Sequence, residues 1–298
     1  IMNNSLTSAA LYDGLEAYPA DRCVALLNPL SSDLGVMRQS LIFGGLESLA
    51  HNLNRKADDL AMYEFGHVYF FRSESESTAD APLAPYKEGA RLAMWLCGDR
   101  RKGNWARKAE EATFFDLKAA LEAVLGRLGL DPRQVVTEPS ADNDLFAAAL
   151  AVKSRNGKVL GHIGLVAKKL LRKFDISLPV AFAELDWEAL CRLAGKQKVE
   201  FTPLPKTLPV RRDLALLVDR QVTFADIESA VRQAGGKLLS DVELFDVYEG
   251  ENLPAGKKSY AVTFTLQDPE KTLADKQIEA AVARIVANLA KRTGAELR

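Results

Sequence analysis

Hydrophobic and polar residues alternate in three segments of the last hundred residues, the pattern of half-buried β-strands. These segments are residues 213–218, 242–248 and 259–266. A helix that begins after Thr223 separates the first two, and a second with apolar residues at helical spacing ends at Gly294. With a short last strand at residues 295–298, the order becomes β-α-β-β-α-β. The pattern therefore predicts a ferredoxin-like domain.

Side-chain direction divides the predicted sheet into a bulky face and a small, polar face. Two helices cover one face of such a sheet, so we place the bulky residues beneath them, Phe245 and Val247 included. The other face, called the open face below, collects Asp213, Ala215, Asp246, Tyr248, Ser259 and Ala261. Such a face can stack single-stranded RNA bases on its aromatic residue and bond their edges, or it can simply face solvent.

The preceding two thirds of the chain predict a second α+β domain. A helical stretch is expected from Thr7 or Ser8 to Ala17, and residues 42–53 present one apolar helix face. Two strands at residues 146–153 and 159–166 flank an Asn-Gly pair, a strong hairpin signal. Prolines at 203, 205 and 209 exclude a regular helix or central strand there. We therefore expect two domains, residues 1–198 and 199–298.

Bulk composition narrows the functional classes. The 298 residues carry a net charge of −1, which argues against a generally basic nucleic-acid-binding protein. The three cysteines are far apart in the sequence, as is common in reduced cytoplasmic proteins, and no apolar run approaches membrane length. We expect a cytoplasmic protein without a membrane or DNA partner.

Five ordered motifs in the last hundred residues carry a family resemblance: RRDLALLV from Arg211, FDVY from Phe245, KKSYAVTF from Lys257, KTLAD from Lys271 and GAELR from Gly294. They resemble the ferredoxin-fold anticodon-binding domain of the beta subunit of bacterial phenylalanyl-tRNA synthetase. Ala274 stands where this family usually has Thr or Ser. The change weakens a helix capping box and should cost roughly 1 kcal/mol of stability.

The first domain resembles the module of the same beta subunit that descends from a class II synthetase core, a mainly antiparallel sheet with helices. The resemblance rests on NPLSSDLGVMRQSL from Asn28, NLNRK from Asn52 and YEFGHVYFFRSE from Tyr63. Phe71, Arg72 and Glu74 resemble its second motif, in which an arginine clamps the ATP α-phosphate. The glycine-rich third motif is missing from the sequence, and DNDLFAAAL from Asp142 replaces a His-Pro-Gly-Arg type segment. We expect a degenerate core without catalytic residues, metal ligands or a small-molecule site.

The resemblance implies a C-terminal part of a longer beta subunit of phenylalanine–tRNA ligase. In that family, catalytic alpha subunits pair with beta subunits as an (αβ)₂ heterotetramer, which attaches phenylalanine to tRNA(Phe) with ATP and Mg²⁺. This part itself would hold no cofactor. Its helix at residues 41–54 would contribute to the subunit interface. A free-standing RNA-binding protein and a structural interaction module remain as alternatives.

The resemblance also assigns roles to residues of the second domain. The positions that match the family's anticodon contacts are Ala215, Asp246, Tyr248 and Ser259. Candidate phosphate contacts are Arg211, Arg212, Lys257 and Lys258, for which ordinary surface charge is an equal alternative.

Overall fold

The computed structural model describes residues 1–73, 77–78, 80–130, 134–141, 143–196, 201 and 203–298. The chain forms two compact units, unit 1 (Ile1–Val199) and unit 2 (Glu200–Arg298). The expected domain boundary at residue 198 lies outside the described residues. Each unit is α+β with antiparallel sheets, as the sequence predicts.

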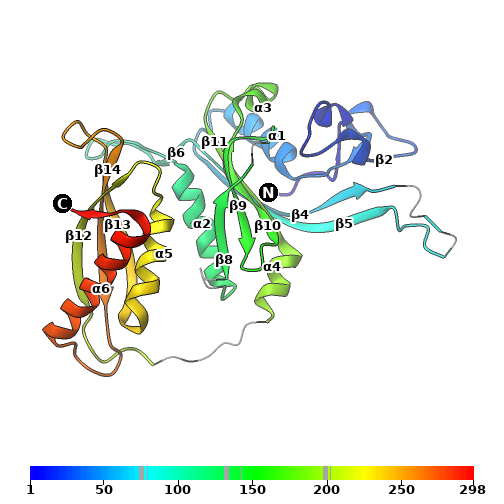
Figure 1. Ribbon diagram of the computed structural model, residues 1–298. Coiled ribbons are helices and arrows are strands. Elements are labelled where there is room, and N and C mark those ends of the chain that lie inside the picture. Colours follow the sequence, from blue (N-terminus) through cyan, green and yellow to red (C-terminus); the bar gives the residue numbers. More distant parts are fainter. Residues whose placement is uncertain (74–76, 79, 131–133, 142, 197–200, 202) are drawn as a thin grey trace. The chain divides into compact units, whose positions relative to one another are not determined.

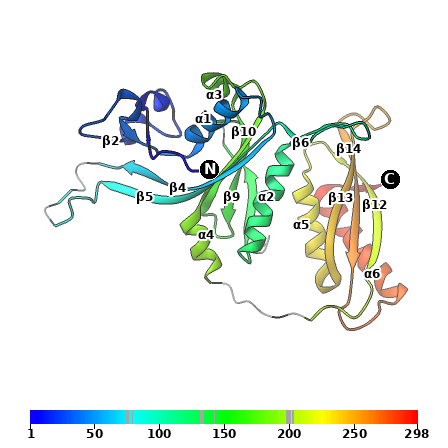
Figure 2. The same cartoon turned by 180° about the vertical axis from the view of Figure 1, so that it is seen from behind.

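Unit 1 is built on a six-stranded sheet in the order β4-β5-β11-β10-β9-β8, with every neighbouring pair antiparallel. Its strands are β4 (Leu60–Phe71), β5 (Tyr86–Cys97), β8 (Val135–Pro139), β9 (Phe146–Ser154), β10 (Val159–Val166) and β11 (Val180–Asp186). The predicted hairpin around Asn156 and Gly157 is confirmed as β9 and β10. The strands β4 and β5 continue together as a long two-stranded ribbon (Figure 2).

Helices pack on both faces of this sheet (Figure 1). On one face lies α1 (Ile42–Leu53), next to the short strands β1 (Leu6–Thr7), β2 (Val24–Ala25) and β3 (Val36–Met37). A Cβ on Gly45 would lie 2.0 Å from the Trp95 ring, so glycine allows this helix to approach the sheet closely. The opposite face carries α2 (Phe114–Arg127) and α4 (Trp187–Ala194). The remaining elements are β6 (Asp99–Arg101), β7 (Glu110–Glu111) and α3 (Lys168–Lys173).

The prediction of a helix from Thr7 or Ser8 to Ala17 in unit 1 is wrong. Residues 8–17 form only a 3₁₀ turn, Ala9–Tyr12, instead of a helix up to Ala17. Tyr12 is fully buried, and its hydroxyl accepts the Gln39 backbone N–H at 2.9 Å. This segment is held by tertiary contacts rather than by the amphipathic spacing of a helix.

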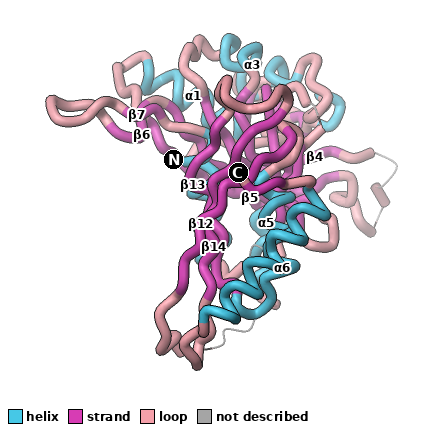
Figure 3. The backbone as a smooth tube through the Cα atoms, turned by 60° about the vertical axis from the view of Figure 1, so that its left-hand side comes forward, coloured by secondary structure: helices cyan, strands magenta, loops and turns pink. Residues whose placement is uncertain are grey.

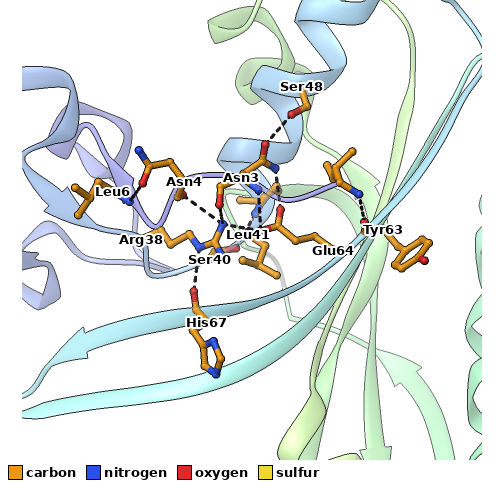
Figure 4. Close-up of polar contacts among 12 residues, drawn as sticks. Asn3, Asn4, Leu6, Arg38, Ser40, Leu41, Ser48, Tyr63, Glu64 and His67 are labelled. Carbon is orange, nitrogen blue, oxygen red and sulfur yellow. Dashed lines mark hydrogen bonds and ion pairs between the residues drawn. The ribbon is translucent and has the colours of Figure 1, made fainter.

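A buried ion pair fixes the start of the chain to the sheet (Figure 4). Arg38 and Glu64 approach to 2.8 Å with side chains only 6% and 0% exposed. The Asn3 side chain donates to the Glu64 carboxylate at 2.8 Å, and Arg38 donates to the His67 carbonyl at 2.9 Å. Hydrogen bonds thus satisfy both charges, which a buried pair requires because its desolvation is costly.

Unit 2 has the predicted ferredoxin-like topology, with sheet order β13-β14-β12-β15 and antiparallel pairing throughout. Its elements are β12 (Val210–Asp219), α5 (Phe224–Gly235), β13 (Leu239–Tyr248), β14 (Lys257–Leu266), α6 (Asp275–Thr293) and β15 (Glu296–Leu297). Figure 3 shows α5 and α6 together on one side of the strands. The core lies between these helices and the covered face, where Val218, Val262 and Phe264 are fully buried.

The two helices of unit 2 begin differently. Thr223 accepts the Asp226 backbone N–H, and the Asp226 carboxylate accepts the Thr223 N–H in return, a complete capping box. Hydrogen bonds from Thr223 hold the pKa of Asp226 below its usual value. This cap therefore stabilises the fold above the usual carboxyl pKa and loses its effect as the pH falls through the lowered value. At α6, Gln277 accepts the Ala274 N–H, but the Ala274 side chain makes no cap hydrogen bond.

We predict that Ala274→Ser stabilises unit 2, because the new hydroxyl can accept an N–H that the methyl group cannot. The free energy of unfolding should rise by about 1 kcal/mol, the usual effect of an N-cap serine over alanine. Thr223→Ala is the opposite control and should lower it by a similar amount. Urea denaturation of the chain measures both changes. An Ala274→Ser variant no more stable than the parent would contradict this account of the α6 cap.

Candidate nucleic-acid interface

Strand register brings the predicted anticodon residues together on the open face. Asp246, Ala261 and Ala215 lie opposite one another across β13, β14 and β12. In the next row, Tyr248 lies opposite Ser259. Directly opposed residues of neighbouring antiparallel strands point to the same face. The four predicted contact positions therefore share two adjacent rows of one face.

A β-bulge in β13 makes this arrangement possible. The pairing shifts between Leu244, opposite Val262, and Asp246, opposite Ala261. Plain alternation from the half-buried Leu244 would turn Asp246 toward the helices, and the extra residue, Phe245, turns it outward instead. The prediction that Phe245 lies buried beneath the helices is wrong, because this bulge residue is 56% exposed.

Val247 departs from the prediction in a different way. It lies opposite the buried Tyr260, on the covered side as predicted, but it is 47% exposed. The residue stands near the end of the edge strand β13, one position from the last strand residue. Strand direction was therefore correct here, whereas the degree of burial was not.

An arginine that the sequence reasoning missed covers part of the open face. The Arg298 guanidinium lies 5.7 Å from the centroid of the Tyr248 ring, a cation–π distance. Its backbone N–H donates to the carbonyl of Ala215 at 3.0 Å. Ala215 lies on β12, which β14 separates from β13 in the sheet. The side chain thus reaches across the open face toward Tyr248. Ser259, opposite Tyr248, is only 6% exposed. The GAELR motif contains this arginine, but only strand register shows what it reaches.

Gly250 sets the position of the Tyr248 ring. A Cβ built on Gly250 would lie 2.1 Å from the Tyr248 hydroxyl oxygen and 2.2 Å from Cζ. No side chain fits there unless the ring moves. The turn after β13 therefore lets the Tyr248 ring lie against the backbone of Gly250, and Tyr248 as a whole is 36% exposed.

Two of the four candidate phosphate contacts have carboxylate partners near the open face. Arg211 pairs with Glu243 at 2.9 Å, and both side chains are more than half exposed. Lys257 pairs with Asp219 at 3.1 Å. An exposed pair such as Arg211–Glu243 contributes little to stability, so Arg211 can exchange its partner at small cost. The Lys257 side chain is only 24% exposed.

The other two candidates lie on the opposite side of the sheet. Lys258 is 8% exposed, opposite Val218, and its ammonium lies 4.7 Å from the centroid of the Tyr260 ring. Arg212 is exposed but lies opposite Phe264, a residue of the covered face. We therefore leave Lys258 and Arg212 out of the contact set proposed below.

The residues that resemble a class II second motif lie at the end of β4, in unit 1. The Phe71 and Tyr86 ring centroids are 5.6 Å apart, and the Arg72 backbone N–H donates to the Pro85 carbonyl at 2.8 Å. Glu74 lies outside the described residues. Among the residues that the structure describes, no three His, Cys, Asp or Glu side chains gather as a metal site would require. Nor does any helix in those ranges have the length and apolarity needed to cross a membrane.

Two family models match the chain, one for each unit. The model described as "Phenylalanyl tRNA synthetase beta chain CLM domain" matches residues 1–187. The model described as "Ferredoxin-fold anticodon binding domain" matches residues 205–298.

Curated relatives match along the whole chain. The phenylalanine–tRNA ligase beta subunit of Porphyromonas gingivalis is 51% identical over 298 residues, and that of Bacteroides fragilis is 48% identical. The Syntrophotalea carbinolica subunit of the same name is 33% identical over 300 residues. These alignments cover 100% of this chain but only 36% of each relative. Among solved structures, pyrrolysyl-tRNA synthetase from Desulfitobacterium hafniense aligns with 65% of this chain and 62% of its own, at 14% identity and a TM-score of 0.46.

We predict that Gly250→Ala displaces the Tyr248 ring, because the added methyl group occupies its place. The NMR signals of the Tyr248 ring should shift, and the influence of Arg298 on them should weaken. Gly126→Ala is the matched control, since a Cβ there meets nothing within 4 Å. Unchanged Tyr248 signals in Gly250→Ala would show that the glycine does not position the ring.

Proposed function

This chain belongs to the family of phenylalanyl-tRNA synthetase beta chains, and we propose from that premise that the open face of unit 2 binds the anticodon loop of a tRNA. The observation that carries the proposal is the placement of Asp246 and Tyr248 in adjacent rows beside small residues. A flat floor with one exposed aromatic ring and one carboxylate suits an unstacked base.

Each side chain has a distinct task in this proposal. Ionised Asp246 can only accept hydrogen bonds, so it suits the N–H groups on the Watson–Crick edge of guanine. The Tyr248 ring offers a stacking surface for the same base or its neighbour. Ala215 and Ala261 keep the floor low enough for a base to lie flat.

The Arg298 side chain must change its contacts when a base stacks on this face of the Tyr248 ring. Its guanidinium occupies the ring face that a stacked base would use, so it either sandwiches the base or leaves the ring. Ser259, opposite Tyr248, is 6% exposed, so it contacts a base or ribose only when a neighbouring side chain moves. Arg211 and Lys257 then remain as the candidates for phosphate contacts, after exchange of their carboxylate partners.

Unit 1 has an assembly role in the same proposal. Its sequence lacks the third motif of a class II core, so a separate alpha subunit would perform the ATP- and Mg²⁺-dependent attachment of phenylalanine. We propose that the chain works in the cytoplasm as part of an (αβ)₂ complex. The α1 helix turns Ile42 and Leu46 into its own core, whereas Tyr63 and Phe65 on the edge strand β4 are 60% and 53% exposed. The interface would therefore include β4 in addition to residues 41–54.

We predict that Asp246→Ala weakens binding of a tRNA(Phe) anticodon stem-loop to the chain by about tenfold or more, as loss of a good base contact does. Asp241→Ala removes another exposed carboxylate from the same strand, opposite Thr265 and away from Asp246, and is the control. Tyr248→Ala should weaken binding similarly, whereas Tyr248→Phe keeps the stacking ring and most of the affinity. Fluorescence anisotropy across a salt series measures all four variants.

A preference for the cognate stem-loop over one with a changed anticodon, retained at high salt, is expected of base readout. Equal effects of Asp246→Ala and Asp241→Ala would contradict a specific role for Asp246. Absence of binding by the parent chain would instead favour a purely structural module.

A further inference from the structure

The β6–β7 hairpin of unit 1 ends in a fully exposed tryptophan. Of the three tryptophans in the chain, Trp95 is 1% exposed, and Trp187 packs on Phe65 with ring centroids 4.8 Å apart. Trp105, at the tip of the hairpin, is 99% exposed and therefore adds no packing to the fold. Burial of so large an aromatic side chain is normally favourable. A ring that stays outside the core is available to a ligand.

Hydrogen bonds order the turn that carries this ring. The Asn104 side-chain oxygen accepts two backbone N–H groups of the turn, at 2.9 and 3.1 Å. The Asn104 N–H donates to the Arg107 carbonyl at 2.9 Å, which closes the turn around Trp105. A Cβ on Gly103 would lie 2.9 Å from the Ala109 backbone nitrogen, so the two arms lie close together just below the tip. An ordered turn lowers the entropy cost of binding through its side chains.

Ion pairs anchor the base of the hairpin to the rest of unit 1. Arg100 lies 3.0 Å from Asp116, in the first turn of α2, and also pairs with Glu110 on the opposite arm. Lys102 lies 3.1 Å from Asp59, the residue before β4. Carboxylates thus compensate these cations of the first arm.

The cations that follow the turn are not compensated in this way. The run from Arg100 to Lys108 contains five basic residues and no acidic residue. Arg107 and Lys108 are exposed, and their side chains form no ion pair with any residue that the structure describes. The exposed Trp105 ring is therefore flanked by positive charge that the described part of the chain does not neutralise.

We propose that this hairpin binds a single-stranded segment of RNA, with one base stacked on Trp105 and neighbouring phosphates on Arg107 and Lys108. An unpaired strand offers both a flat base and adjoining negative charge, the two groups that the tip can receive. A membrane surface matches less well, because membrane-binding segments present several large apolar side chains. Ala106 is the only other apolar residue between Lys102 and Lys108. The site lies wholly in unit 1 and is independent of the open face of unit 2.

Tryptophan fluorescence of the 298-residue chain tests this directly, because unit 2 contains no tryptophan to report binding at the open face. A base stacked on Trp105 quenches its emission. We expect saturable quenching by single-stranded octauridylate and loss of most of that quenching in Trp105→Phe. Duplex RNA of the same length should quench much less, because its bases already stack on one another.

Arg107→Ala tests the phosphate contact. This variant keeps Trp105, so its quenching curve still gives the affinity for octauridylate. The slope of log affinity against log salt concentration should become shallower by about 0.7, the value for one phosphate contact on a single strand. Arg155→Ala is the matched control, since it removes an exposed arginine from the tip of the β9–β10 hairpin in the same unit.

Each outcome bears on the proposal. Quenching that is lost in Trp105→Phe, with a shallower salt slope in Arg107→Ala alone, supports the site. An equal change of slope in Arg155→Ala would mean general charge attraction and would overturn it. Equal quenching by duplex RNA would overturn the stacking of an unpaired base. No quenching by octauridylate up to millimolar concentration, or quenching only by vesicles of phosphatidylglycerol, would overturn RNA binding by the hairpin.

Discussion

One extra residue in β13 decides what the open face of unit 2 presents. Up to Leu244 this strand sends apolar side chains into the core, as Val242 does at 8% exposure. Continued alternation would carry Asp246 and Tyr248 into the same core, where an unpaired carboxylate would be very costly. The bulge at Phe245 reverses the alternation and places both side chains outside. The stable core and the polar surface can therefore share one strand.

The fold was largely predictable because its elements carry local signals. Strands of unit 2 alternate with period two, the Asn156–Gly157 turn specifies a hairpin, and Thr223 with Asp226 marks a helix start. Residues 8–17 misled prediction because Tyr12 is buried by distant residues such as Phe43, with ring centroids 5.1 Å apart. Contacts of that kind leave no periodic pattern in the local sequence.

Sequence reasoning placed the four predicted anticodon positions on one face, but it also placed Lys258 and Arg212 beside them, and these two residues lie on the covered side. Alternation and resemblance together placed Asp246, Tyr248 and Ser259 on one face, and the strand register agrees. The Arg298 side chain follows the edge strand β15 and contacts Tyr248 on the other edge strand, β13. No local sequence pattern predicts a contact between two edge strands.

Photocrosslinking tests most directly whether the open face receives the anticodon loop. A tRNA(Phe) anticodon stem-loop with 4-thiouridine in the loop is irradiated with the 298-residue chain, and crosslinked peptides are identified by mass spectrometry. We expect crosslinks on β13 and β14, centred on the peptide that contains Tyr248, and competition by unmodified cognate stem-loop. Crosslinks confined to α5 and α6, which cover the other face of the sheet, would contradict anticodon binding by the open face.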